Sequence, residues 1–169
     1  VILPEQLNER QSQAFDNVKR HFEVGGDIAL HQMALGTAGT GKSWLLYALS
    51  HLLGGHVKRA APTGMAAFLI GGSTLHSLLY LPVCGGKALQ GGGLSRLQER
   101  LTGAMKEGVG GGRYVIIDEL LMGSQAQMAW VDRRLREATG KTTVPFGGVS
   151  VVMTGAPGQL PPVGGRPLH

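Results

Sequence analysis

Residues 36–43 have the composition of a phosphate-binding loop. They are Gly36, Thr37, Ala38, Gly39, Thr40, Gly41, Lys42 and Ser43, a full match to the pattern G-x-x-x-x-G-K-[ST]. The glycines let backbone N–H groups turn inward around a polyanion, and a helix that follows adds the positive end of its dipole. Lys42 would reach the β- and γ-phosphates of ATP, and the Ser43 hydroxyl would ligate Mg²⁺. A chance match in a glycine-rich chain is the alternative, but the segment falls between a predicted strand and a predicted helix.

A pair of carboxylates follows a short apolar run. Asp118 and Glu119 come directly after residues 114–117, which read Tyr-Val-Ile-Ile and predict a central strand of a parallel sheet. A carboxylate at the carboxyl end of such a strand lies beside the phosphate loop in folds of this kind. Asp118 could then hold Mg²⁺ through water, while Glu119 orients and deprotonates the attacking water. The alternative is a solvated acidic pair that closes a strand.

Gln159 lies on a turn after the apolar run 149–154. On that turn its amide could sense the γ-phosphate and count among the catalytic groups. The alternative is a loop whose shape is fixed by its prolines.

The elements that must position these residues alternate along the chain. Apolar periodicity predicts helices at 7–22, 43–53, 63–70, 94–101 and 125–138, and strands at 28–35, 57–61, 114–117 and 149–154. Glycine-rich segments at 85–93 and 103–112 predict flexible surface loops. Strands that alternate with helices indicate an α/β fold with a mostly parallel sheet flanked by helices, as in P-loop NTPases.

Composition sets broader limits. A chain of 169 residues with 43% hydrophobic residues suits one compact domain. The net charge of +5, from 16 Lys and Arg against 11 Asp and Glu, favours polyanionic partners. One cysteine, Cys84, allows no internal disulfide, which fits a reducing compartment. The chain opens at Val1 instead of Met, so we expect a fragment of a longer protein.

Several motifs together resemble superfamily 1 DNA helicases of the PIF type, which are related to RecD and to the helicases of Helitron transposons. The segments that carry the resemblance over nearly the whole chain are the loop at 36–43, the acidic pair, Leu7-Asn8-Glu9-Arg10-Gln11, Ala61-Pro62-Thr63-Gly64-Met65-Ala66-Ala67, Thr74-Leu75-His76-Ser77, Asp132-Arg133-Arg134-Leu135-Arg136, Pro145-Phe146-Gly147-Gly148 and Gln159-Leu160-Pro161-Pro162-Val163. Arg166-Pro167-Leu168 is similar to the Helitron-type branch.

The resemblance implies a RecA-like three-layer sandwich over 1–169 and an ATP-dependent helicase that unwinds DNA in the 5′→3′ sense. Gln11 would read adenine, and Thr63, Thr74 and His76 would lie along the single-stranded DNA. A second RecA-like domain with an arginine finger would belong to the same parent protein. The family further implies roles in DNA repair, recombination and telomere maintenance, in the nucleus or the mitochondrion.

Two departures from the family pattern support a different hypothesis. Leu121 stands where the family has the serine of Asp-Glu-x-Ser, and Ala156-Pro157 replaces Asp-Phe before Gln159. These changes remove polar links between hydrolysis and DNA contact, so a non-enzymatic nucleotide- or DNA-binding remnant of a transposon helicase is the alternative. A P-loop kinase is a third possibility, although no lid or acceptor pocket can be found in the sequence.

Side chains outside the motifs are assigned more ordinary roles. Arg133, Arg134 and Arg136 predict a solvated helix face. Trp44 and Trp130 fall at helical positions that favour a place in the core over base stacking.

Overall fold

The computed structural model describes residues 4–25, 27–37, 39–82, 92–102, 114–119 and 125–156. The α-helices are α1 (Glu9–Val24), α2 (Lys42–Leu53), α3 (Gly64–Leu69), α4 (Leu75–Leu79), α5 (Gly92–Thr102) and α6 (Gln125–Thr139). The strands are β1 (His31–Leu35), β2 (Val57–Ala61), β3 (Ser73–Thr74), β4 (Tyr114–Ile117) and β5 (Ser150–Gly155). Short 3₁₀ turns are η1 (Pro4–Gln6), η2 (Gly54–His56) and η4 (Pro145–Gly148). No helix in these ranges is long and apolar enough to cross a membrane.

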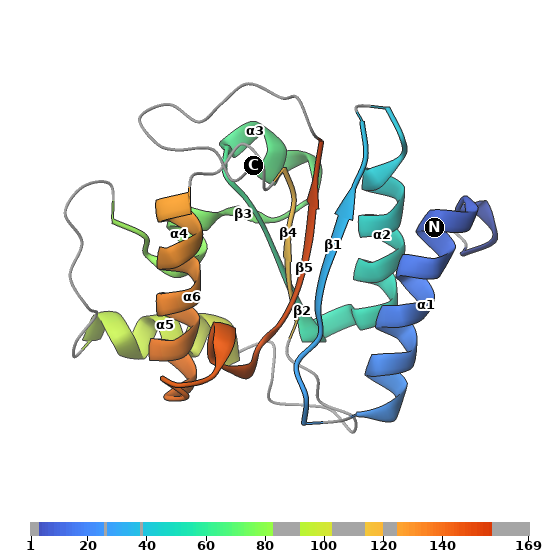
Figure 1. The fold of residues 1–169 in the computed structure, drawn as a ribbon. Helices are drawn as coiled ribbons and strands as arrows, with labels where there is room; N and C mark the ends of the chain where they lie inside the picture. Colours follow the sequence, from blue (N-terminus) through green and yellow to red (C-terminus); the bar gives the residue numbers. More distant parts are fainter. Residues whose placement is uncertain are drawn as a thin grey trace.

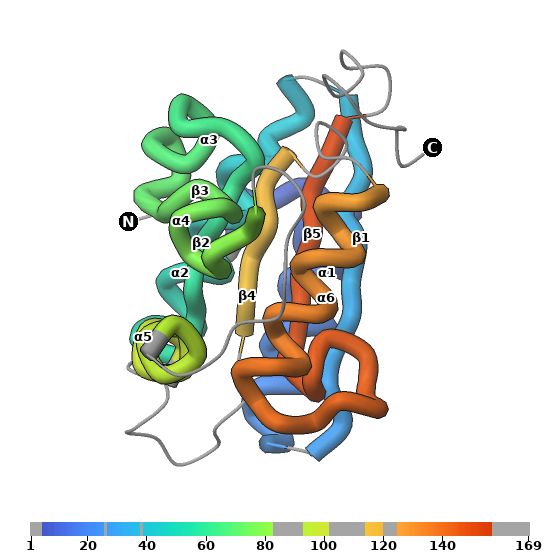
Figure 2. Tube along the Cα trace, turned by 90° about the vertical axis from the view of Figure 1, so that its left-hand side faces the viewer, coloured from blue at the N-terminus to red at the C-terminus, as the bar shows by residue number. Residues whose placement is uncertain are grey.

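The strands form one parallel sheet in the order β1-β5-β4-β2-β3. Figure 1 shows α1 and α2 on one side of this sheet and α4, α5 and α6 on the other. Figure 2, turned by a quarter, shows α3 near the upper end of β2 and β3. The arrangement is the RecA-like three-layer sandwich that the resemblance implied.

Two apolar clusters hold the layers together, one on each face of the sheet. In β4, Val115 and Ile117 join the cluster beneath α4, α5 and α6, whereas Tyr114 and Ile116 join the cluster beneath α1, α2 and α3. A strand covered on both faces must be apolar at every position, which is why 114–117 reads as an unbroken hydrophobic run.

The helix and strand boundaries follow the sequence closely where an element is buried. β2 and β4 have the predicted limits. β1 begins at His31 instead of residue 28, and Ile28 is 83% exposed. Helix α5 begins at Gly92, so the last two residues of the predicted loop 85–93 are helical. The rest of that loop and the predicted loop at 103–112 lie outside the described residues.

β3 and α4 were not predicted. Thr74 ends the two-residue strand and accepts a hydrogen bond from the Ser77 N–H at 3.1 Å, which caps the five-residue helix α4. Elements this short have too few residues for a hydrophobic period to be recognised.

Two of the side-chain predictions are wrong. Arg134 is buried, donating to Glu137 Oε2 at 2.7 Å and to the Tyr80 carbonyl oxygen at 3.3 Å. Its guanidinium also lies 4.9 Å from the centre of the Trp130 ring, which packs against the core as predicted. Trp44, in contrast, is 47% exposed on α2. The spacing of polar and apolar residues along one helix does not show which of them the neighbouring elements will cover, and this is why both predictions failed.

The turn at η4 allows a stability prediction. Gly147 has a φ of +63°, and an added Cβ would lie 2.5 Å from the Leu135 carbonyl oxygen. Gly140 has a φ of +73° but has no atom within 4 Å of the added Cβ. We expect Gly147→Ala to lower the free energy of unfolding by about 2–5 kcal/mol, through both backbone strain and overpacking. Gly140→Ala should lower it by only about 1–2 kcal/mol, through strain alone. Equal shifts in urea unfolding would contradict the steric argument.

Candidate functional site

The predicted phosphate loop connects β1 to α2 at the carboxyl edge of the sheet. The Gly36 N–H donates to the Gly155 carbonyl oxygen at 3.0 Å, which fixes the start of the loop against the end of β5. An added Cβ on Gly36 would lie 2.6 Å from Thr40 Oγ1, and Gly39 and Gly41 have φ values of +80° and +76°. The loop therefore needs glycine at these positions for room and for backbone conformation.

Helix α2 begins at Lys42, one residue before the predicted start, without a side-chain hydrogen bond at its N-cap. The first N–H groups of a helix have no partners within the helix, so they can donate to an anion. The Lys42 Nζ donates to the Gly36 and Thr37 carbonyl oxygens, each at 2.8 Å. The ammonium thus lies across the loop and donates to two carbonyl oxygens. Phosphate oxygens can take the place of these carbonyl oxygens as its acceptors. The Ser43 residue is exposed.

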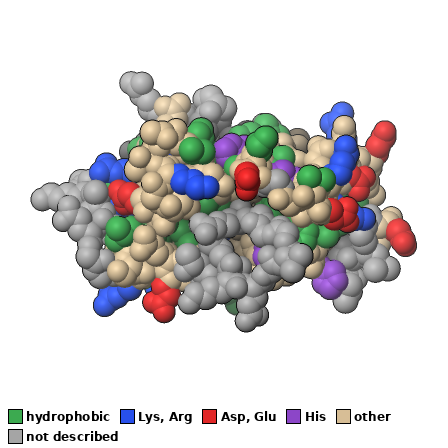
Figure 3. Space-filling model, turned by 90° about the horizontal axis from the view of Figure 1, so that it is seen from below, with side chains coloured by type: hydrophobic (Ala, Val, Ile, Leu, Met, Phe, Trp, Pro, Cys, Tyr) green, Lys and Arg blue, Asp and Glu red, His purple; other side chains and the backbone are tan. Residues whose placement is uncertain are grey.

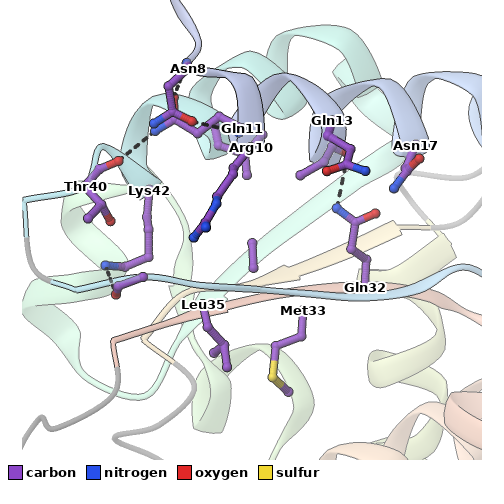
Figure 4. A pocket seen from close by; sticks show the side chains of 14 residues that line it. Asn8, Arg10, Gln11, Gln13, Asn17, Gln32, Met33, Leu35, Thr40 and Lys42 are labelled. Carbon is purple, nitrogen blue, oxygen red and sulfur yellow. Dashed lines mark hydrogen bonds between the residues drawn. The ribbon is translucent and has the colours of Figure 1, made fainter.

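Gln11 joins α1 to this loop. It forms a capping box with Asn8, in which each side chain accepts from the other residue's backbone N–H, at 2.9 and 3.0 Å. Its Nε2 donates to the carbonyl oxygens of Thr40 at 2.7 Å and of Gly41 at 3.0 Å. Figure 4 shows the Gln11 amide reaching from α1 to Thr40. Two segments that the sequence connects only by resemblance are in direct contact.

A pocket of about 490 Å³ lies between α1, β1 and the loop. Arg10, Gln11, Gln32, Leu35 and Lys42 are among the side chains that line it. Figure 4 places Arg10, Gln11 and Lys42 around the same space, with Leu35 on the strand below. Its lining residues include two cations and no carboxylate, so the pocket suits an anionic ligand.

The acidic pair lies at the same edge of the sheet. The Asp118 N–H donates to the Ala60 carbonyl oxygen at 2.9 Å, which continues the hydrogen bonding between β4 and β2. Asp118 Oδ1 accepts from the Glu119 N–H at 2.9 Å and from the Thr154 hydroxyl on β5. These contacts hold the Asp118 carboxylate in one orientation, and Glu119 turns out of the strand with a φ of +53°.

The electrostatics of Glu119 relate it to both Asp118 and Lys42. Burial, and after it the negative charge of Asp118, raise the pKa of the Glu119 carboxyl, whereas the positive charge of Lys42 lowers it. An effect of Lys42 on this pKa requires the two charges to be near each other in the fold. A carboxylate with a raised pKa is a stronger base than a solvated one.

The three predicted DNA-contact residues lie at or just after the ends of β2 and β3: Thr63 after β2, Thr74 at the end of β3, and His76 in α4. Thr63 caps α3 by accepting from the Ala66 N–H at 3.2 Å, and Thr74 caps α4. His76 is exposed on α4. Each capping hydroxyl oxygen accepts a hydrogen bond, so its own proton can still be donated to a phosphate oxygen. Capping explains both threonines without DNA, and contact with DNA stays a prediction.

The comparisons with known proteins bear on this arrangement. The family model described as PIF1-like helicase matches residues 6–168. The chain belongs to the PIF1-like helicase family. It is 36% identical over 134 residues to the ATP-dependent DNA helicase PIF6 of Trypanosoma brucei brucei, covering 76% of this chain and 16% of that protein. It is 36% identical over 145 residues to the ATP-dependent DNA helicase RRM3 of Saccharomyces cerevisiae, covering 79% of this chain and 18% of that protein.

Solved structures of PIF1-like helicases have the same fold. Bacteroides Pif1 bound to ssDNA superposes with a TM-score of 0.71 and 32% identity, covering 93% of this chain and 33% of that one. Bacteroides Pif1 in complex with ADP-AlF3 and ssDNA has a TM-score of 0.71 and 31% identity, covering 93% of this chain and 34% of that one. The chain therefore spans less than a fifth of the length of PIF6 and RRM3 and about a third of the Bacteroides enzyme.

The structure adds one residue to the site of this PIF1-like family member that the sequence did not predict. Thr154 bonds the Asp118 carboxylate, and it is fully buried. A lone hydroxyl at the end of the apolar run Val-Val-Met-Thr was the available signal. Of the residues predicted from the motifs, Ala38, Leu121 and Gln159 lie outside the described residues. Ala156 is described and is buried directly after β5.

Proposed function

We propose that this chain is the ATP-binding motor domain of an ATP-dependent DNA helicase. The observation that carries the proposal is the joining of Gln11 to the phosphate loop through two hydrogen bonds, with Lys42 in the same pocket. An amide and a cation line the same pocket, and these groups suit the base and the phosphates of ATP. In this assignment Gln11 reads adenine, and the backbone of residues 36–43 encloses the phosphates.

Mg²⁺ accompanies ATP in the proposal, and Ser43 and Asp118 would hold it. Mg²⁺ in such sites takes one or two protein ligands and completes its shell with water and phosphate oxygens. The described residues contain no cluster of three or more His, Cys, Asp or Glu that could hold a metal ion. The hydrogen bonds that Asp118 accepts from Glu119 and Thr154 both end on Oδ1, so Oδ2 would be the oxygen offered to a metal-bound water. When bound with ATP, Mg²⁺ neutralises charge on the phosphates.

Glu119 is the proposed general base. Its raised pKa and its position after the strand that carries Asp118 suit it to accept a proton from the attacking water. Lys42 would stabilise the charge that builds up on the transferred phosphoryl group. Gln159, which follows β5 in the chain, would sense whether the γ-phosphate is present.

DNA is the second proposed partner. Thr63, Thr74 and His76 would contact the backbone of single-stranded DNA at the edge of the sheet that also carries the nucleotide pocket. The intact helicase would unwind duplex DNA in the 5′→3′ sense with a second RecA-like domain of the same parent protein. Roles in DNA repair, recombination and telomere maintenance, in the nucleus or the mitochondrion, belong to the same proposal.

A steady-state ATPase assay tests this function. The intact parent protein should hydrolyse ATP faster when single-stranded DNA is added. The isolated chain should turn over roughly 10³-fold or more slowly than the intact protein, because an arginine finger contributes about 10³–10⁵ in rate and is expected on the second domain. If the intact protein binds ATP but shows no turnover with or without DNA, the motor proposal is wrong and the non-enzymatic remnant, suggested by Leu121 and Ala156, replaces it.

A further inference from the structure

A second pocket lies at the opposite edge of the sheet from β1. It has a volume of about 490 Å³, and its polar lining consists of Lys58, Arg59, Ser73, Ser77 and Arg100. We call it the edge pocket. Unlike the nucleotide pocket, it includes no residue of the phosphate loop or of the acidic pair.

The shortness of β3 creates the edge pocket. β3 pairs only with Ala60 and Ala61, so residues 57–59 of β2 have no strand partner on that side in the part of the chain that the structure describes. Ala60 belongs to the apolar cluster beneath α4, α5 and α6, and Ala61 to the cluster on the other face. Because side chains alternate along a strand, Lys58 shares the face of Ala60 and Arg59 the face of Ala61. The two cations therefore flank the open strand edge from both faces.

Arg59 is held in place by the turn before β3. An added Cβ on Gly72 would lie 2.4 Å from the Arg59 carbonyl oxygen, so the turn crosses directly over this residue. The position corresponding to a Cβ on Gly71 lies 3.8 Å from the Arg59 Nη1. The guanidinium thus rests against a turn that has no side chains to cover it.

Arg100 reaches the pocket from α5. Its Nη1 donates to the Ser77 carbonyl oxygen, and its guanidinium lies 4.5 Å from the centre of the Tyr80 ring. A guanidinium has five N–H donors in a rigid plane, so these contacts position it and still leave donors for a ligand.

The charge of the edge pocket is not balanced within it. None of its lining residues is acidic. The ion pairs between described residues lie within α1 and α6, and none involves Lys58, Arg59 or Arg100. Figure 3 shows that charges of both signs are interspersed on the face seen from below in Figure 1. Three cations and two hydroxyls around one hollow favour a ligand with several negative oxygens.

We propose that the edge pocket binds backbone phosphates of a nucleic acid. Ser73 and Ser77 line it and flank Thr74 and His76 in the sequence, so a strand that contacts those two residues can continue around β3 into the pocket. The inference rests on the proposed DNA binding and extends its track to the outer edge of the sheet. An acidic peptide is the competing ligand.

Salt dependence of DNA binding tests the edge pocket. Fluorescence anisotropy with a labelled oligothymidylate would be followed from about 50 to 200 mM KCl. Each phosphate contact contributes about 0.7 to the slope of log affinity against log salt for single strands. Lys58→Ala and Arg59→Ala should each reduce the slope by about that amount and weaken binding about 5–10-fold at the lowest salt. Arg59→Lys should recover most of the loss.

The matched control is Arg96→Ala, which removes an exposed cation from the same helix as Arg100 but outside the pocket. The DNA affinity of this variant should stay within about twofold of the affinity of the unsubstituted chain. Lys58→Gln and Arg59→Gln keep most of the side-chain length, and circular dichroism melts of all variants identify any that fail to fold. If folded Lys58 and Arg59 variants show the same slope of log affinity against log salt as the unsubstituted chain, the proposal is overturned.

Two further outcomes separate the alternatives. If the Lys58 and Arg59 variants lose binding to poly-glutamate but still bind DNA as the unsubstituted chain does, the edge pocket binds an acidic peptide and the nucleic-acid proposal is overturned. If the parent chain binds no DNA at all, the proposed DNA contact itself fails, and the edge pocket fails with it. If the unsubstituted chain binds DNA and the Lys58 and Arg59 variants bind it equally well, only the edge-pocket proposal is overturned.

Discussion

Lys42→Ala is expected to abolish ATP binding at the concentrations at which the parent chain is saturated. The ammonium lies 2.8 Å from the carbonyl oxygens at positions 36 and 37, at the mouth of the pocket that Gln11 also lines. Removing one member of a close charge pair costs about 2–5 kcal/mol, which corresponds to roughly 30-fold to several thousand-fold in affinity. Equilibrium titration with a fluorescent ATP analogue measures this loss directly.

The control for Lys42 is Lys19→Ala. Lys19 is a half-exposed cation on α1 whose Nζ lies 4.0 Å from Glu23, so its loss should change ATP affinity by less than about twofold. Because Lys42 also donates hydrogen bonds to carbonyl oxygens of the loop, its loss could destabilise the fold. A thermal melt of the variant therefore distinguishes lost binding from lost folding. A folded Lys42→Ala chain that binds ATP as tightly as the parent would show that the triphosphate is not bound by this loop.

Glu119→Gln is expected to spare ATP binding and to stop its hydrolysis. Glutamine keeps the shape of the side chain but cannot accept a proton from water, and general-base catalysis is worth about 10²–10⁴ in rate. The affinity should change little, because burial and Asp118 already disfavour a charge at this position. Single-turnover hydrolysis in the intact protein with DNA present separates the chemical step from product release.

Glu23→Gln provides the comparison for Glu119, since Glu23 is an exposed carboxylate at the far end of α1. That variant should hydrolyse ATP at the parent rate. If Glu119→Gln loses less than about threefold in single-turnover rate, the base is another group, because a true general base contributes at least about 100-fold.

One backbone hydrogen bond links Asp118, which directly follows β4, to the strand that leads to Thr63. The Asp118 N–H is bonded to Ala60 on β2, and β2 leads through Ala61 and Pro62 to Thr63 at the cap of α3. The backbone that carries the proposed metal ligand is therefore bonded to the strand that carries a proposed DNA contact. In a helicase this adjacency offers a short route between the nucleotide and the DNA.

Features that are encoded by contiguous residues could be predicted without a structure. A phosphate loop is a backbone conformation, so its glycines, lysine and serine must occur together and could be recognised without a structure. The buried parallel strand 114–117 is a continuous apolar run, and both it and strand 57–61 were predicted to the residue. The family followed from the order of these local motifs.

Contacts between residues far apart in the sequence could not be predicted in this way. Gln11 contacts the loop because α1 packs beside α2, and Thr154 meets Asp118 because β5 lies next to β4 in register. Arg134 is buried because α6 packs against α4 and the residue that follows it. The edge pocket exists because β3 is two residues long. Such contacts depend on packing and register across the sheet, and no stretch of neighbouring residues records them.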